Sequence, residues 1–348
     1  MAGISVAVSV VMPQMSALEA GLFGAGHTQR IGVVFGMKRR TADLAGEPVA
    51  FVALPDGRRI AYREFGAQDG HPVLSLHGTP GSRLKFEMAD AEARQAGLRL
   101  ISIDRWGYGF TDLNPRTTLA AFSRDMEVLA DALLFERFAV MGISGGGPFA
   151  TATAACEGLG DRISALALVA PVGPIAGTPV GLNMSPFHIF AFRAVSQTPG
   201  AVRFGFGGFR SLLGGHSALA MKIAAARAST VDRSVVCRPH QRQSLVDAFR
   251  AGLAFGCDGP VTDMRMFGRR WDIDPRSIRC RSRMWLGTAD RNIPIRAARY
   301  LAETIPECEL TELDGHGHYW VIDHIPEVLG WIARTFELGP RSRPENQK

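Results

Sequence analysis

The sequence predicts an α/β protein built on a doubly wound, mostly parallel sheet, and three observations lead to this fold class. Short apolar runs typical of buried strands alternate along the chain with segments of helical periodicity. The first two runs are joined by Asp56-Gly57, a hairpin signal that makes the start of the sheet antiparallel. The alternation is broken once, between about 172 and 276, by a long segment with helical patterns. We expect this segment to cover the carboxyl ends of the strands, where such sheets place their sites.

Eight apolar runs bounded by turn residues are expected to form the strands of this sheet. They fall at Val49–Leu54, Arg58–Phe65, Pro72–His77, Leu98–Ile103, Phe138–Ile143, Ile163–Ala170, Ser282–Leu286 and Glu309–Leu313. Helices are predicted at Leu119–Phe135, Gly146–Glu157 and Ala297–Thr304, and within the inserted segment at His216–Ala228 and Pro239–Phe255.

The same alternation divides the chain into a core and an insertion. Near the N-terminus, the apolar stretch Ile4–Met12 is too short to span a bilayer, and no basic residue precedes Arg30 as a signal peptide would require. We expect the extension to be poorly ordered in part. The predicted parts are an N-terminal extension (1–45), an α/β core (46–171 and 277–338), a helical cap (172–276) and a polar tail (339–348).

Composition limits the classes of partner. The 46% hydrophobic content is enough for a large buried core, and the net charge of +6 is concentrated in Arg193–Arg283, which holds 16 Lys/Arg against 6 Asp/Glu. A solvated basic surface is favoured over a role in steering anions. Nucleic-acid binding is not expected, because no basic helix with interleaved aromatics or finger-type cysteine spacing occurs. The five scattered cysteines form no C-x-x-C pair, which indicates reduced thiols and a cytoplasmic location.

The stretch Gly142-Ile-Ser144-Gly-Gly146 follows an apolar strand and precedes a predicted helix. A serine at such a turn is held in a strained conformation, and glycines two residues to either side let strand and helix approach closely. Two other interpretations remain. The first is a plain glycine-rich turn, and the second is a dinucleotide fingerprint formed by Gly145, Gly147 and Ala150, although that fingerprint belongs in the first βαβ unit. A P-loop is excluded because no Lys-Ser or Lys-Thr follows the glycines.

A nucleophilic serine needs a base and an acid that orients the base. Asp290 follows a predicted strand, and it would orient the base or cap the next helix. No Asp or Glu occurs from Pro171 to Phe192, where the other acid position would lie. The base is expected at His318, with its flanking Gly317, and His316 is the second choice.

The two histidines also allow a metal site with Asp323 or His324, but no H-E-x-x-H motif or third ligand at a fixed spacing supports one. We therefore predict no metal. An oxyanion would need two backbone N–H donors. Gly145 is the first candidate, and Thr79 is the second because the neighbouring Pro80 has no N–H. We expect His77 to brace this loop rather than to catalyse.

Five motifs in this order resemble the α/β-hydrolase superfamily over about Pro48 to Phe336: His77–Arg83, Asp104–Gly109, Gly142–Gly146, Gly287–Asp290 and Gly315–His318. The resemblance implies an eight-stranded sheet, a helical cap between the sixth and seventh strands, and a Ser-His-Asp triad without a cofactor. In similar sequences the last motif reads G-x-G-H, which implies that His318 is the base.

The nucleophile narrows the expected chemistry. Dehalogenases and epoxide hydrolases of the superfamily have Asp at the elbow, so Ser144 disfavours both. We expect a serine hydrolase that cleaves a carboxylic ester or related acyl bond through an acyl-enzyme. The alternatives are an enzyme similar to proline iminopeptidases, whose elbow typically reads Gly-Ser-Trp-Gly, a cofactor-free haloperoxidase, or a catalytically silent binding protein.

The aromatic and basic cap is expected to favour a small-molecule substrate with an apolar acyl group or an anionic group. Phe187, Phe190, Phe192 and Phe204 are candidates to line its pocket or to pack within the cap. No stable membrane insertion is expected, and the sequence leaves the oligomeric state open.

Overall fold

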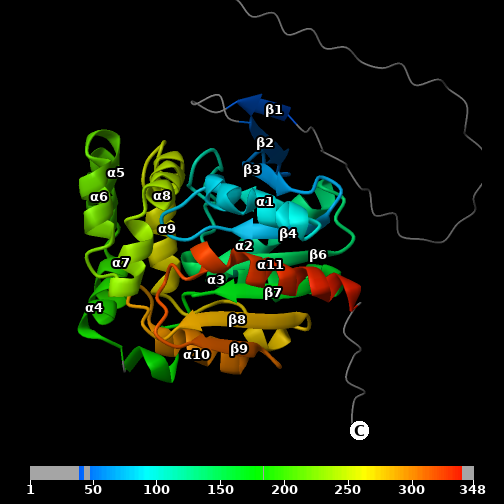
Figure 1. Ribbon diagram of the computed structural model, residues 1–348. Helices are drawn as coiled ribbons and strands as arrows, with labels where there is room; N and C mark the ends of the chain where they lie inside the picture. The colour runs from blue at the N-terminus through cyan, green and yellow to red at the C-terminus, as the bar shows by residue number, and fades with distance from the viewer. Residues whose placement is uncertain (1–38, 43–47, 183, 339–348) are drawn as a thin grey trace, which may run out of the picture. The chain divides into compact units, whose positions relative to one another are not determined.

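The computed structural model describes residues 39–42, 48–182 and 184–338. Their strands form one sheet in the order β1-β2-β3-β5-β4-β6-β7-β8-β9 (Figure 1). The bounds are β1 Arg39–Ala42, β2 Pro48–Ala53, β3 Arg59–Gly66, β4 His71–Leu76, β5 Leu98–Ile103, β6 Phe138–Ile143, β7 Ile163–Val169, β8 Arg281–Gly287 and β9 Glu309–Leu313. The pairs β1–β2, β2–β3 and β3–β5 are antiparallel and the others parallel.

This topology confirms the predicted mostly parallel sheet with an antiparallel start. The eight predicted strands are β2 to β9, and β1 adds a ninth at the edge. Apart from β1, the predicted N-terminal extension and the polar tail fall on residues 1–38, 43–45 and 339–348, which lie outside the described residues.

Helices cover both faces of the sheet (Figure 1). In β7 every residue is buried, and successive side chains enter opposite layers: Leu166 and Leu168 contact the layer of α2, α3 and α10, whereas Ala165 and Ala167 contact the layer of α1 and α11. The bounds of these helices are α1 Asp90–Gln95, α2 Leu119–Ala132, α3 Gly147–Ala154, α10 Ile295–Thr304 and α11 Val321–Glu337.

Among the described residues, six α-helices lie between β7 and β8, and we call the segment that they form the insertion: α4 Pro186–Ile189, α5 Pro199–Gly215, α6 Ser217–Ala224, α7 Thr230–Val236, α8 Pro239–Gly252 and α9 Asp258–Phe267. Part of the insertion packs in a separate apolar cluster around Met221, Leu245 and Phe249, which Ile322 of α11 joins. The glycine- and phenylalanine-rich stretch 204–209 lies inside α5, where the sequence did not predict a helix because glycine disfavours one. The domain boundaries at 172 and 276 stay a prediction.

No helix within the described ranges is both long and apolar enough to cross a bilayer.

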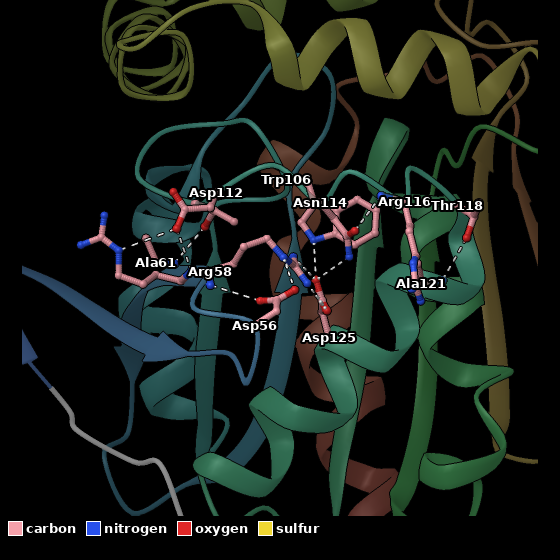
Figure 2. Close-up of polar contacts among 12 residues, drawn as sticks. Asp56, Arg58, Ala61, Trp106, Asp112, Asn114, Arg116, Thr118, Ala121 and Asp125 are labelled. Atoms are coloured by element: carbon pink, nitrogen blue, oxygen red, sulfur yellow. Dashed lines mark hydrogen bonds and ion pairs between the residues drawn. The ribbon is translucent and has the colours of Figure 1, made fainter.

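Figure 2 shows how the loop after β5 is anchored. The carboxylate of Asp125 on α2 accepts hydrogen bonds from both terminal nitrogens of Arg58, at 2.6 and 2.9 Å, and from the indole N–H of Trp106, at 2.8 Å. Trp106 lies in the Asp104–Gly109 motif, so its hydrogen bond to a mostly buried ion pair holds the loop that borders the site described next.

Candidate active site

Ser144 follows the last residue of β6 and has a φ of 55°, a left-handed conformation that non-glycine residues rarely adopt. The glycines on either side permit this turn. A Cβ on Gly142 would lie 2.6 Å from the Cβ of Ala150, and one on Gly146 would lie 2.8 Å from the carbonyl oxygen of His77. Neither position has room for a side chain, so strand and helix approach each other as closely as the sequence pattern indicates.

His318 and Asp290 form a buried pair. The Nδ1–H of His318 donates to Oδ2 of Asp290 at 2.7 Å, and the two side chains come from loops 28 residues apart. The other oxygen of Asp290 accepts from the backbone N–H groups of Asn292, at 2.7 Å, and Ile293, at 3.3 Å. Asp290 therefore stabilises its own turn and also holds the imidazole. It does not cap the next helix, α10, whose N-cap residue is Pro294 without a side-chain capping hydrogen bond.

The environment of His318 makes the imidazole a stronger base. Burial by itself lowers the pKa of His318, but the charge and hydrogen bond of Asp290 outweigh that effect, and the Asp232 carboxylate adds to it. The net result is a pKa above the usual value. Asp290 also fixes the tautomer, because a proton held on Nδ1 leaves Nε2 as the acceptor.

The second-choice histidine has a different setting. The Nδ1–H of His316 donates to the carbonyl oxygen of Asp314 at 2.9 Å, and its ring meets that of His324 edge to face. Ser144 and His318 line a common cavity, and the described residues that line it do not include His316. The structure thus brings Ser144, His318 and Asp290 together and leaves His316 outside. Nor do the described ranges hold three His, Cys, Asp or Glu side chains grouped to bind a metal.

Both candidate oxyanion donors border the same cavity as Ser144. A Cβ on Gly78 would lie 3.2 Å from the Cβ of Ser144, so the loop after β4 passes directly over the serine. His77 supports this loop, since its Nδ1–H donates to the carbonyl oxygen of Gly78 at 2.8 Å and its Nε2 accepts the backbone N–H of Arg105 at 3.1 Å. Burial, followed by the charge of Arg105, holds the pKa of His77 well below its usual value, so it stays neutral.

One carboxylate in this region was not identified from the sequence. Asp263 on α9 is buried and accepts hydrogen bonds from the Arg105 guanidinium, at 2.6 and 2.8 Å, from the Tyr108 hydroxyl, at 2.6 Å, and from the Thr79 hydroxyl, at 2.5 Å. Arg105 also donates to the carbonyl oxygen of His77 at 2.9 Å. Asp263 therefore ties the insertion to the loop that carries Thr79. It lies 158 residues from Arg105, and no local motif marks it.

A second buried carboxylate, Asp232 on α7, holds the loop that carries His318. It accepts the backbone N–H of Tyr319 and the hydroxyl of Ser229, each at 2.8 Å. A Cβ on Gly317 would collide with this carboxylate, which explains why glycine precedes His318. Gly317 marks the base in the sequence, but the carboxylate that requires a glycine there lies in the insertion.

Replacing Asp232 with asparagine is expected to lower the pKa of His318. In the wild type the Asp232 charge raises this pKa, so removing the charge shifts protonation of the imidazole to lower pH. An NMR titration of the His318 ring measures the effect. Asp323→Asn is the matched control, because Asp323 is exposed and paired with Arg238. An unchanged or higher pKa in Asp232→Asn would show that Asp232 has no electrostatic effect on the base.

The cavity shared by Ser144 and His318 has a volume of about 460 Å³. Its wall combines the core with the insertion, and its lining is mostly apolar, including Val202, Phe206, Phe209, Met264 and Phe267. Of the four phenylalanines considered from the sequence, Phe187 and Phe192 line this cavity, and Phe187 is also partly open to solvent. Phe190 and Phe204 are exposed and are not among the described residues that line it.

Comparison with known families supports the fold. A model of the alpha/beta hydrolase family matches residues 73–329, well over half of the chain. The chain belongs to the alpha/beta hydrolase family. The match begins within β4 and contains β5 to β9, the whole insertion, and the three residues Ser144, Asp290 and His318.

Individual relatives of this alpha/beta hydrolase are distant. A non-heme chloroperoxidase from Streptomyces lividans is 32% identical over 146 residues, which cover 40% of this chain and 52% of that protein, so the chain spans about half the length of this relative. Among solved structures, an alpha/beta hydrolase fold protein from Nakamurella multipartita is 25% identical, with a TM-score of 0.58 over 81% of this chain and 99% of that one. The esterase RhEst1 from Rhodococcus sp. ECU1013 is 20% identical, with a TM-score of 0.59 over 84% and 99%.

Proposed function

We propose that this alpha/beta hydrolase is a serine hydrolase that cleaves carboxylic esters through an acyl-enzyme. Two observations carry the proposal together: the hydrogen bond from His318 to Asp290, at 2.7 Å, and the cavity that His318 shares with Ser144, which lies in a strained turn. An imidazole with a raised pKa and an unprotonated Nε2 is suited to accept a hydroxyl proton.

In this mechanism the hydroxyl oxygen of Ser144 attacks the ester carbonyl carbon while Nε2 of His318 takes the proton. The backbone N–H groups of Gly145 and Thr79 stabilise the resulting oxyanion. Collapse of the intermediate breaks the bond to the alcohol oxygen, which receives the proton from His318. Water then repeats the sequence on the acyl-enzyme, releasing the carboxylic acid and restoring Ser144.

A second candidate function is favoured by the 32% identity to a chloroperoxidase. The same three residues serve both reactions, because hydrogen peroxide in place of water converts the acyl-enzyme into a peracid. A peracid oxidises halide to hypohalous acid and is itself reduced to the carboxylic acid. Bromination of monochlorodimedone with acetate, bromide and peroxide tests this second function, and its absence alongside ester hydrolysis would leave the esterase proposal alone.

A fluorophosphonate probe is expected to form a covalent adduct on Ser144. The activated hydroxyl attacks phosphorus and displaces fluoride, and mass spectrometry of the digested protein locates the adduct. Ser144→Ala is the control and should not be labelled. A folded wild-type protein without an adduct at Ser144 would contradict the proposal and favour a catalytically silent binding protein. A p-nitrophenyl ester panel of increasing chain length then defines the acyl preference.

A further inference from the structure

A second, smaller cavity of about 60 Å³ adjoins the large one at Ser144 and His318. The two cavities share Thr79, Ser144 and His318, so a substrate whose carbonyl carbon reaches Ser144 has access to both. Their linings differ in charge. Of the described residues around the two cavities, Lys85 is the only Lys or Arg, and it lines the smaller one.

Lys85 lies in the 3₁₀ turn Arg83–Ala89 that follows the loop over Ser144. Its neighbours Leu84 and Phe86 are buried, and Lys85 is itself half-buried. Among the residues that the structure describes, no carboxylate forms an ion pair with it. By contrast, its neighbour Arg83 pairs with Asp104 at 3.0 Å with both side chains fully buried.

The charge of Lys85 acts on the site. Burial lowers the pKa of Lys85 to about 8, which leaves it mostly protonated at neutral pH. After the larger effects of burial, Asp290 and Asp232, the Lys85 charge opposes protonation of His318. A partly desolvated ammonium without a carboxylate partner is unfavourable, and an anionic group of a ligand would relieve this cost.

Size and charge together indicate what the smaller cavity accepts. About 60 Å³ accommodates a group of a few atoms but not the chain or ring for which the apolar cavity of about 460 Å³ has room. We propose that the smaller cavity is a carboxylate subsite, in which Lys85 binds the anionic end of a short acyl group while the apolar alcohol portion of the ester occupies the larger cavity. This inference rests on the proposed ester hydrolysis and names its substrate class: half-esters of short dicarboxylic acids with an apolar alcohol.

Two benzyl esters of equal acyl length test the subsite. Benzyl hydrogen succinate carries a carboxylate where benzyl butanoate carries a methyl group, and release of benzyl alcohol is measured for both by chromatography. We expect the wild type to favour the succinate half-ester in kcat/KM by roughly 10- to 100-fold, as for a hydrogen bond between charged groups. Lys85→Met should abolish this preference and bring the ratio of the two kcat/KM values close to one. Lys85→Arg should retain part of the preference.

Lys222→Met is the matched control, because it removes the same charge from an exposed position outside both cavities, and it should keep the wild-type ratio. Thermal unfolding of each variant verifies the fold, and Lys85→Arg carries the test if Lys85→Met is unstable. A wild type without preference, or a Lys85→Met variant with the wild-type ratio, would overturn the carboxylate subsite while ester hydrolysis and Ser144 labelling persist. Failure to hydrolyse either ester, together with an unlabelled Ser144, would overturn the proposed function and the subsite together.

Discussion

Replacing Asp290 with asparagine is expected to lower kcat for ester hydrolysis by about 10⁴-fold, the size of the effect in other Ser-His-Asp sites. Asparagine has nearly the same shape, and its carbonyl oxygen can still accept the backbone N–H groups of Asn292 and Ile293. What it removes is the negative charge facing His318, together with the preference for a proton on Nδ1. The loss should therefore appear in kcat with little change in the thermal unfolding midpoint.

Asp314→Asn provides the matched control for this measurement. Asp314 is exposed, and its carboxylate accepts a hydrogen bond from the Thr288 hydroxyl in the same pair of loops. Its replacement should leave kcat within about twofold, because it changes a surface contact of small energy. An Asp290→Asn enzyme with near wild-type kcat would show that Asp290 does not orient the base.

Replacing Asp263 with alanine is expected to lower the free energy of unfolding by about 3–5 kcal/mol. The Arg105 guanidinium is fully buried and makes its ion pair with this carboxylate, so the variant would leave a buried charge without its partner. The hydroxyls of Tyr108 and Thr79 would lose the same acceptor. Chemical denaturation monitored by circular dichroism measures the change.

Asp258→Ala on the same helix is the comparison. Asp258 is exposed and pairs with Arg203 at 2.8 Å, so its removal should cost no more than about 1 kcal/mol. Adding Arg105→Met to Asp263→Ala should recover part of the stability, because the unpaired charge is then gone. Equal losses in Asp258→Ala and Asp263→Ala would contradict a central role for the buried network.

Much of the fold could be predicted because it depends on local patterns. The eight strands β2–β9 were expected within a residue or two, since apolar runs and turn residues are properties of short segments. The helix α5 was missed because its glycines disfavour a helix, whereas Val202 and Leu213 are buried on its inner face. There, tertiary packing overrides propensity.

The order of Ser144, Asp290 and His318, and the glycines that shape the serine turn, were readable in the sequence alone. Each is marked by its immediate neighbours, because a strand end, a glycine or a proline constrains the backbone within a few residues. The tertiary structure decided which histidine meets Asp290, and it placed Asp232, Asp263 and Lys85 around the serine turn. Those contacts join residues from separate loops and from the insertion, where hydrogen bonds and charges act through space and leave no pattern along the chain.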